Sequence, residues 1–166
     1  MKKILGVLII SLLSACASQT TKPSAEAVAN DEVIDSSAVE SDGVDFHPLQ
    51  DPNSILSQRS VYYDFDSYAL KSEYRELVVA HAQYLRDNAN AKVLLQGNTD
   101  ERGSREYNLA LGQRRADSVK NMMLLSGARE RQIESVSLGE EKPRVSGHDE
   151  SAWRENRRTD IIYQGE

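Results

Sequence analysis

Hydrophobic and polar residues follow two different spacings between residues 59 and 166. Runs rich in β-branched and aromatic residues predict strands, and apolar residues three or four positions apart predict helices. The expected strands are 60–66, 92–97, 133–138 and 159–163, and the expected helices are 71–86, 106–125 and 149–156. The order βαβαβαβ predicts an α/β sandwich in which helices pack on a four-stranded mixed sheet.

The helix expected at 106–125 has two distinct faces. Its core stripe is predicted to comprise Leu109, Gly112, Ala116, Val119 and Met123. Asn108, Leu111 and Arg115 fall at i, i+3 and i+7 and therefore share another face. This spacing presents Arg115 near the loop that carries Asp100.

The loop between the second strand and this helix carries the most informative chemistry. It leaves the strand at Gly97, turns at Gly103 and includes Asp100. Loops at strand ends are common positions for binding groups. A carboxylate near the guanidinium of Arg115 can form an ordinary salt bridge. The same pair can also receive a zwitterion, with an ammonium at Asp100 and a carboxylate at Arg115. Spacing alone leaves both interpretations open.

The N-terminus has the pattern of a secretory signal peptide. Lys2 and Lys3 precede an apolar run from Ile4 to Leu13, and small residues lead to Cys16. The run is about half of the ~20 residues that span a bilayer, so a transmembrane anchor is the weaker interpretation. Residues 13–16 (Leu-Ser-Ala-Cys) resemble the bacterial lipobox, which implies a leader at 1–15 and lipidation of Cys16. The alternative is an ordinary signal peptide followed by a free cysteine.

Residues 16–58 are predicted to form a lipidated start and a flexible, disordered tether. From residue 17 this segment carries one base, Lys22, and eight acids: Glu26, Asp31, Glu32, Asp35, Glu40, Asp42, Asp45 and Asp51. Its acidity and lack of apolar periodicity argue against a packed element. Whether the tether length is selected stays open. No part of the chain is basic enough to favour nucleic acid as a partner, and a single cysteine excludes an intramolecular disulfide.

Several segments of the region 59–166 carry a resemblance to a known family. The segments are 98–103 (Asn-Thr-Asp-Glu-Arg-Gly), 107–112 (Tyr-Asn-Leu-Ala-Leu-Gly), 114–116 (Arg-Arg-Ala), 63–66 (Tyr-Asp-Phe-Asp), 137–143, 147–150 and 156–158. Together they resemble OmpA-like peptidoglycan-binding domains, and the stretch 61–163 is similar to the peptidoglycan-associated lipoproteins of the Tol–Pal system. Many segments in the right order make the resemblance specific.

The resemblance implies a ligand and a role for each site residue. The family binds the stem peptide of peptidoglycan, chiefly its meso-diaminopimelate residue. By resemblance, Asp100 takes the ammonium, Arg115 takes the carboxylate, and Leu111 forms an apolar wall. Phe65 and Asp66 would line the same pocket, and Asn108 would support the loop. Asn98 stands where many relatives carry His, and either side chain can tie down the loop. The motif Asn156, Arg157 and Arg158 is interpreted as structural.

The resemblance also implies partners and a location. It implies a periplasmic Tol propeller protein as a partner and a role in envelope integrity and cell division. Ala17 after Cys16 matches the sorting pattern for the outer membrane, with the domain facing the periplasm. An OmpA-like wall tether outside the Tol system is the alternative. Neither implies a cofactor or a metal.

An enzyme is the competing class of protein. His81 is expected on the apolar side of the first long helix, as a core histidine, and His148 in the turn before the last short helix. The chain contains no Gly-x-Ser-x-Gly elbow, HExxH helix or phosphate loop. We therefore expect no catalytic residues.

Overall fold

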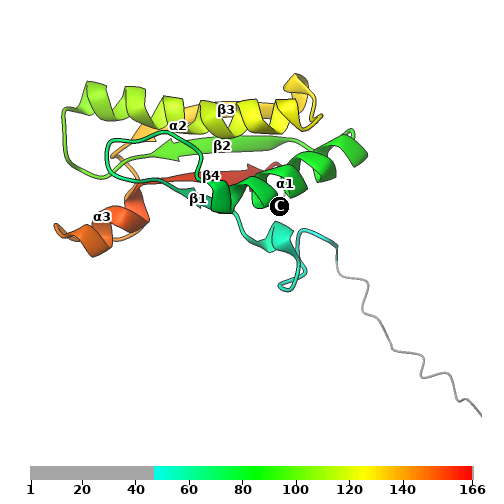
Figure 1. Cartoon of the computed structure of the whole chain (residues 1–166), viewed down its shortest axis with the longest axis horizontal. Helices are drawn as coiled ribbons and strands as arrows, with labels where there is room; N and C mark the ends of the chain where they lie inside the picture. The colour runs from blue at the N-terminus through cyan, green and yellow to red at the C-terminus, as the bar shows by residue number, and fades with distance from the viewer. Residues whose placement is uncertain (1–46, 166) are drawn as a thin grey trace, which may run out of the picture. The chain divides into compact units, whose positions relative to one another are not determined.

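The computed structural model describes residues 47–165, in which helices cover one face of a four-stranded sheet (Figure 1). The elements in chain order are η1 (Ile55–Ser57), β1 (Ser60–Tyr62), η2 (Ser72–Tyr74), α1 (Arg75–Asp87), β2 (Val93–Asn98), α2 (Arg105–Leu125), η3 (Glu130–Gln132), β3 (Ile133–Gly139), α3 (Glu150–Asn156) and β4 (Arg158–Tyr163). The predicted α/β class and the βαβαβαβ order are confirmed. Cys16 and the predicted leader lie outside the described residues.

The strand order in the sheet is β1-β4-β2-β3. β2 and β3 are parallel and joined through α2, as a parallel crossover requires. β4 inserts between β1 and β2 and runs antiparallel to both. Because β1 and β2 therefore point the same way, the loops that follow them meet at one end of the sheet. The start of β4, with α3 before it, lies at that end as well (Figure 1).

The core lies between the sheet and the two long helices. Val93 and Leu95 of β2 alternate with half-buried neighbours and are fully buried, as the period of a strand dictates. Ala116 and Val119 of α2 are also fully buried. His81 of α1 is completely buried, and its ring nitrogens lie 2.9 Å from the Tyr163 hydroxyl and from the Gln58 carbonyl oxygen. The prediction of a core histidine is confirmed.

Two glycines set the spacing between α2 and β2. A Cβ atom at Gly97 would lie 1.8 Å from the carbonyl oxygen of Gly112. A Cβ atom at Gly112 would lie 2.2 Å from Ser137 Oγ and 2.9 Å from the Gly97 oxygen. The helix backbone therefore rests directly on the strand where the strand ends, which brings the first turns of α2 close to the β2–α2 loop.

The packed region begins before residue 59, where the sequence placed the end of the tether. Leu49 and Leu56 are buried and belong to the core cluster. The Arg59 side chain donates from Nε to the Leu56 carbonyl oxygen (2.6 Å) and from Nη2 to the Leu49 carbonyl oxygen (2.9 Å). Leu49 follows Pro48 and Leu56 follows Ile55 in an otherwise polar stretch, so no periodic pattern marks them. Their burial depends on contacts with the distant α1.

A second difference concerns Leu109, which was predicted to face the core. Its side chain is 52% exposed, whereas Gly112, Ala116, Val119 and Met123 are buried as predicted. Near its N-terminus α2 turns Asn108 and Leu111 inward, so that Leu109 points outward. The expected first strand is also shorter, because the chain leaves the sheet after Tyr62.

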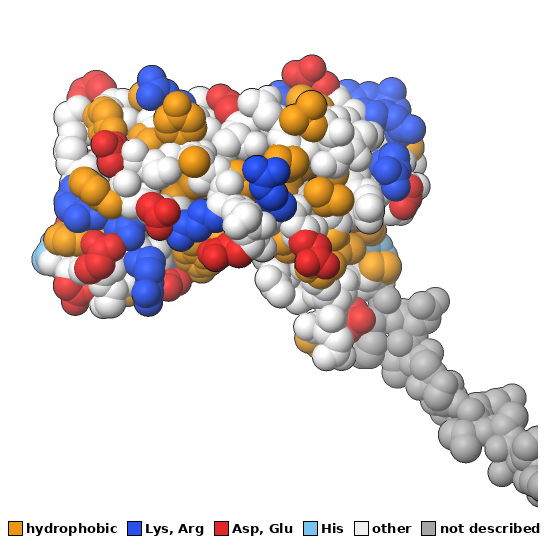
Figure 2. All heavy atoms as spheres, viewed as in Figure 1, with side chains coloured by type: hydrophobic (Ala, Val, Ile, Leu, Met, Phe, Trp, Pro, Cys, Tyr) orange, Lys and Arg blue, Asp and Glu red, His pale blue; other side chains and the backbone are white. Residues whose placement is uncertain are grey.

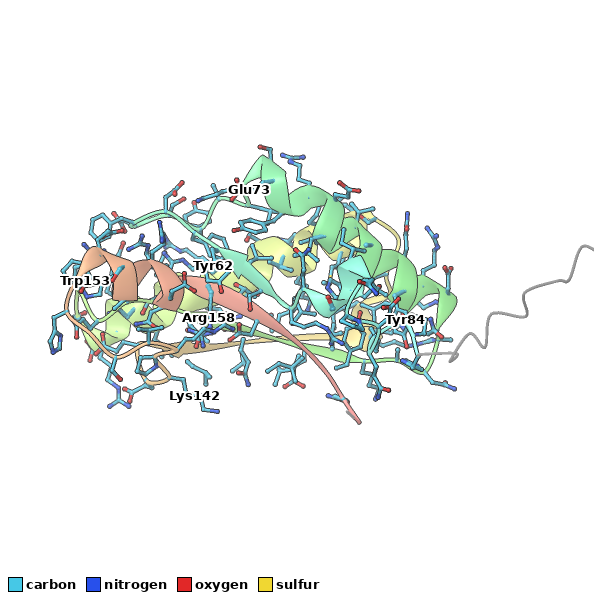
Figure 3. The ribbon with its side chains drawn as sticks, turned by 90° about the horizontal axis from the view of Figure 1, so that it is seen from below. Tyr62, Glu73, Tyr84, Lys142, Trp153 and Arg158 are labelled. Atoms are coloured by element: carbon cyan, nitrogen blue, oxygen red, sulfur yellow. The ribbon has the colours of Figure 1, made fainter. Side chains whose placement is uncertain are left out.

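No helix within residues 47–165 is long and apolar enough to cross a lipid bilayer. Trp153 on α3 and Tyr84 on α1 mark opposite ends of the domain (Figure 3). The end with α3 carries basic and acidic side chains close together (Figure 2).

Candidate functional site

A cavity of about 190 Å³ lies at the end of the sheet where the loops after β1 and β2 meet. It is lined by Phe65, Asp66, Thr99, Asp100, Arg102, Gly103, Tyr107, Asn108, Leu111, Arg115 and Arg157. Three of these side chains are guanidinium groups and two are carboxylates. The lining therefore has an excess positive charge that suits a ligand with at least one carboxylate.

The β2–α2 loop is rigid because its first residues are buried. Asn98, Thr99 and Asp100 are each less than 5% exposed. Asn98 Nδ2 donates to the Gln96 carbonyl oxygen (3.0 Å) and to Asp160 Oδ2 (3.3 Å). These hydrogen bonds hold the start of the loop, the role that the sequence analysis gave to this side chain. Gly103 then adopts φ 112°, a left-handed conformation that favours glycine. Ser104 caps α2 by accepting a hydrogen bond from the Tyr107 amide.

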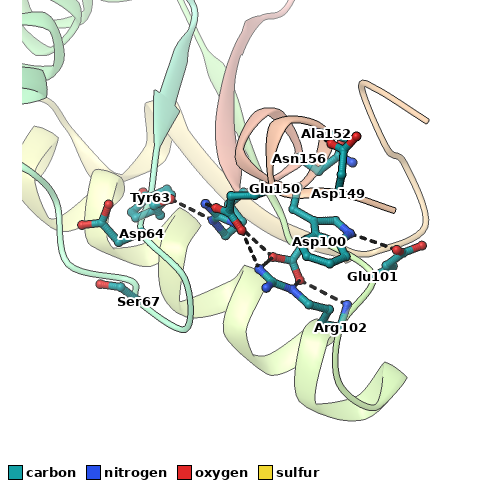
Figure 4. A network of polar contacts seen from close by, with 12 residues as sticks. Tyr63, Asp64, Ser67, Asp100, Glu101, Arg102, Asp149, Glu150, Ala152 and Asn156 are labelled. Carbon is teal, nitrogen blue, oxygen red and sulfur yellow. Dashed lines mark hydrogen bonds and ion pairs between the residues drawn. The ribbon is translucent and has the colours of Figure 1, made fainter. Parts of the chain in front are cut away.

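Asp100 is the acidic centre of the cavity, and it already binds two arginines (Figure 4). Arg102 donates from Nη2 to Oδ2 (2.6 Å), from Nε to Oδ1 (3.3 Å) and from its amide to Oδ1 (3.1 Å). Arg157 donates from Nη1 to Oδ2 (3.2 Å). Burial alone would raise the pKa of Asp100, but the hydrogen bonds from Arg102 and Arg157 outweigh it and lower that pKa. The carboxylate is ionised at neutral pH.

Arg115 is a fully buried guanidinium whose recorded hydrogen bonds all go to main-chain carbonyl oxygens. Nε donates to Ser67 (2.8 Å), Nη1 to Asn98 (2.9 Å) and Nη2 to Asp64 (3.3 Å). Within residues 47–165 no carboxylate lies within ion-pair distance of it. Burial lowers the pKa of Arg115 to about 10, which still leaves it charged at neutral pH. The ordinary salt bridge with Asp100, one of the two interpretations left open, is not formed.

The guanidinium of Arg102 contacts two aromatic rings. Its guanidinium carbon is 4.1 Å from the Phe65 ring centroid and 4.0 Å from the Trp153 ring centroid, within the range of cation–π contacts. Trp153 Nε1 donates to Glu101 Oε1 (2.9 Å), and His148 Nδ1 lies 2.7 Å from the same oxygen. The β1–α1 loop, the β2–α2 loop and α3 are thus joined through one side chain.

Phe65 and Asp66 lie on the β1–α1 loop at the mouth of the cavity. Phe65 is 59% exposed, and Asp66 has a positive φ of 54°. The Tyr107 hydroxyl donates to Asp66 Oδ1 across the mouth. The unusual backbone of Asp66 directs its carboxylate toward α2, so this loop and the first turn of α2 form opposite walls.

The structure brings six of the seven predicted site residues into one cavity. Asp100, Arg115, Phe65, Asp66, Leu111 and Asn108 all line it, whereas Cys16 lies outside the described residues. Asn108 donates from Nδ2 to Glu140, which connects α2 to the segment after β3.

Sequence reasoning missed four further residues of this site: Thr99, Arg102, Tyr107 and Trp153. Arg157 was interpreted as structural, and it does bind the nearby acids Asp100 and Glu150, but it also lines the cavity. Thr99 is buried, and its hydroxyl has no hydrogen-bond partner within residues 47–165. Arg102 and Tyr107 could have been found from the sequence, because they lie in the family segments 98–103 and 107–112. No motif near Trp153 indicated that it belongs to the site.

Comparisons with known proteins show the family of this chain. Residues 62–157 match the model of the OmpA family. The chain is 50% identical over 110 residues to the peptidoglycan-associated lipoprotein of Pasteurella multocida, which covers 65% of this chain and 73% of that protein. It is 36% identical over 165 residues to the peptidoglycan-associated lipoprotein of Legionella pneumophila, which covers 96% and 94%.

A solved structure matches the described domain as well. The crystal structure of the peptidoglycan-associated lipoprotein from Burkholderia pseudomallei aligns with a TM-score of 0.70 and 55% sequence identity. The alignment covers 71% of this chain and 100% of that chain.

Proposed function

The chain belongs to the OmpA family, among its peptidoglycan-associated lipoproteins, and from this premise we propose that its cavity binds the meso-diaminopimelate residue of the peptidoglycan stem peptide. The binding is non-covalent and ties the outer membrane to the cell wall. The side chain of meso-diaminopimelate ends in an ammonium and a carboxylate on one carbon, so a receptor needs one acidic and one basic group side by side.

The observation that carries the proposal is the buried charge of Arg115, which has no carboxylate within ion-pair distance in residues 47–165. A guanidinium has five N–H groups, and three of the nitrogens each use one to hold main-chain carbonyl oxygens. Two N–H groups remain for the cavity, which is the number that a carboxylate accepts in a two-pronged contact. A buried charge without a carboxylate partner is costly, and a ligand carboxylate would offset that cost.

The other side chains complete the receptor. Asp100 takes the ligand ammonium, and the unpartnered Thr99 hydroxyl is free to bond to the same ligand. Leu111 and Phe65 contact the methylene groups of the diaminopimelate side chain. The hydrogen bond between Asn108 and Glu140 and the one between Tyr107 and Asp66 hold the walls of the cavity in place.

We infer a binding protein rather than an enzyme. The cavity lining contains no histidine, serine or cysteine. His81 is buried in the core and His148 binds Glu101 at the surface. Neither is positioned to activate a nucleophile in the cavity.

We also propose the remaining parts of the assembly. Residues 1–15 are the leader, lipidated Cys16 anchors the chain in the outer membrane, and an acidic tether lets the domain reach the wall in the periplasm. A Tol propeller protein is the proposed protein partner, with a role in envelope integrity and cell division. A wall tether outside the Tol system is the alternative. Capture of the purified Tol propeller protein, or failure to capture it, distinguishes the two.

Asp100→Asn tests the receptor directly. The substitution keeps the size of the side chain and removes its charge, so we expect cosedimentation of the full-length protein in detergent with isolated peptidoglycan to fall at least ~10-fold. A peptide containing meso-diaminopimelate should compete with the wild-type protein. Asp87→Asn, at the end of α1 and outside the cavity, is the matched control and should bind normally.

Circular dichroism distinguishes loss of binding from loss of fold in the Asp100→Asn protein. Normal wall binding by a folded Asp100→Asn protein would remove Asp100 from the receptor. Failure of the wild-type protein to cosediment would refute the proposed ligand.

A further inference from the structure

The carboxylate that the proposed function assigns to the ligand ammonium is already occupied by Arg102 and Arg157. The two arginines are held very differently. The Arg157 side chain is 5% exposed and also donates from Nε to the Tyr63 carbonyl oxygen (3.1 Å). The Arg102 side chain is 31% exposed and lies at the mouth of the cavity. Of the two cations on Asp100, Arg102 is therefore the one that a ligand can replace.

The aromatic stack determines where Arg102 lies without the ligand. The rings of Phe65 and Trp153 both lie about 4 Å from the guanidinium carbon, while the nitrogens of that group donate to Asp100. The Trp153 ring is in turn fixed by its hydrogen bond to Glu101, the residue before Arg102. The stack thus holds the guanidinium of Arg102 beside Asp100, at the position that the ligand ammonium would occupy.

We propose that Arg102 is an internal substitute for the ligand ammonium, and that recognition proceeds by exchange of one cation for the other on Asp100. This inference rests on the proposed function. In the free protein, Arg102 neutralises Asp100 and closes the ammonium half of the receptor. The ligand ammonium takes its place, and Arg102 moves out of the Phe65–Trp153 stack.

Glu150 already lies within ion-pair distance of Arg102 and can bind it more closely after displacement. One carboxylate oxygen of Glu150, Oε1, accepts from Arg157 Nη2 at 2.6 Å. The other oxygen, Oε2, lies 3.7 Å from Arg102 Nη2, beyond hydrogen-bond length but within ion-pair distance. A short movement of Arg102 toward Oε2 would replace the contact that it loses with Asp100. Both cations and both carboxylates would remain paired throughout the exchange.

The exchange makes the site selective for ligands that carry an ammonium. A ligand with only a carboxylate can bind Arg115 but cannot displace Arg102. A ligand with an ammonium and a carboxylate occupies both halves of the receptor. Arg102 is thus a specificity-determining residue.

Trp153 is the only tryptophan in the chain, so its fluorescence reports on the stack. The experiment uses the full-length protein in detergent and two stem peptides. One contains meso-diaminopimelate, and the other contains 2-aminopimelate, which has the same carboxylate without the ammonium. At saturation, confirmed by calorimetry, the first peptide should shift the emission of Trp153 to longer wavelength because one ring face becomes exposed to water. The second peptide should leave the emission unchanged.

Arg102→Ala tests the exchange through affinity. Removing the internal competitor should strengthen binding of the diaminopimelate peptide by about five-fold, equivalent to ~1 kcal/mol. Arg105→Ala is the matched control, because it removes the same charge at the surface, where Arg105 binds Glu141. It should not change the affinity. Glu150→Gln keeps an oxygen for Arg157 but removes the new partner of Arg102, so it should weaken binding by about two- to five-fold.

The outcomes separate this inference from the proposed function. Calorimetric binding of the diaminopimelate peptide with unchanged Trp153 emission would refute the exchange and leave the ligand assignment intact. Weaker binding by Arg102→Ala would show that Arg102 contacts the ligand directly, which also refutes the exchange. If the wild-type protein does not bind the peptide in calorimetry, the proposed function fails and the exchange fails with it.

Discussion

The two charged centres of the cavity are buried in different ways. Asp100 is paired with arginines on both sides. Arg115 donates to main-chain carbonyl oxygens, lies 5.1 Å from the Tyr63 ring centroid and keeps its positive charge inside the protein. Carbonyl dipoles stabilise a guanidinium less than a carboxylate does. At the scale of single residues, this difference is the reason for proposing that Arg115 contacts a ligand carboxylate.

Glu101 and His148 allow a test of the surface contacts that support the stack. The hydrogen bond and charge of Glu101 raise the pKa of His148, and the hydrogen bonds from His148 and Trp153 lower the pKa of Glu101. Because the pKa of His148 is raised and that of Glu101 is lowered, the pair is fully formed between the pKa of a free glutamate, ~4.3, and that of a free histidine, ~6.5. Its contribution to stability is lost as the pH rises through the raised pKa of His148 or falls through the lowered pKa of Glu101.

We therefore expect Glu101→Gln to lower the pKa of His148 toward that of a free histidine. The substitution removes the negative charge that favours the imidazolium. NMR titration of the His148 ring resonances measures the change directly, with Glu134→Gln on β3 as the control. A His148 pKa that does not differ between the wild-type and Glu101→Gln proteins would mean that the contact is absent in solution.

At the scale of elements, the contact between α2 and β2 positions the site. Gly97 is the residue at which β2 passes under α2, and Asn98 to Asp100 follow directly. Every residue of α2 that lines the cavity, from Tyr107 to Arg115, depends on this close approach. Any side chain at Gly97 would push the helix away from the strand.

Gly97→Ala should destabilise the domain by about 3 kcal/mol or more, because the added methyl group meets backbone atoms that cannot rotate away. Denaturant unfolding measures the loss. Gly165→Ala is the control, since a Cβ atom there meets nothing within 4 Å. Because Gly165 has a positive φ, this substitution should lower the stability only slightly. Equal stability of the two variants would contradict the proposed role of the close contact.

At the scale of the whole molecule, the proposed function divides the chain into an anchor, a tether and a receptor. Only the receptor, within residues 47–165, is described by the structure. Several anchored copies acting on one wall polymer would bind together more tightly than one copy alone, because tethering raises the effective concentration. The affinity of a single cavity can then be modest, which allows release during cell division.

Cys16→Ser tests the anchor. Without the sulfur no lipid can be attached, so the protein should move from the membrane fraction to the soluble fraction of lysed cells, as detected by immunoblotting. Two lipid chains are needed for stable anchoring. Ser14→Ala, two residues away, is the control and should leave the protein in the membrane. Full membrane retention of Cys16→Ser would refute the lipid anchor.

The sequence by itself determined the elements, their order and the loop that carries the site. Strand and helix spacings are local properties of the backbone, so the seven regular segments could be predicted from 59 to 166. Helical spacing also placed Asn108, Leu111 and Arg115 on one face. The family motifs identified Asp100, Phe65 and Asp66 as their companions, and all six residues line one cavity.

Only the tertiary structure decided the partners of the charged groups and the limits of the core. Whether Asp100 binds Arg115, Arg102 or Arg157 depends on how the β1–α1 loop, the β2–α2 loop and α3 meet. The outward direction of Leu109 and the burial of Leu49 likewise depend on neighbours distant in the sequence. Such contacts are set by the rigid packing of whole elements, and a periodic pattern along the chain contains no information about the distance between them.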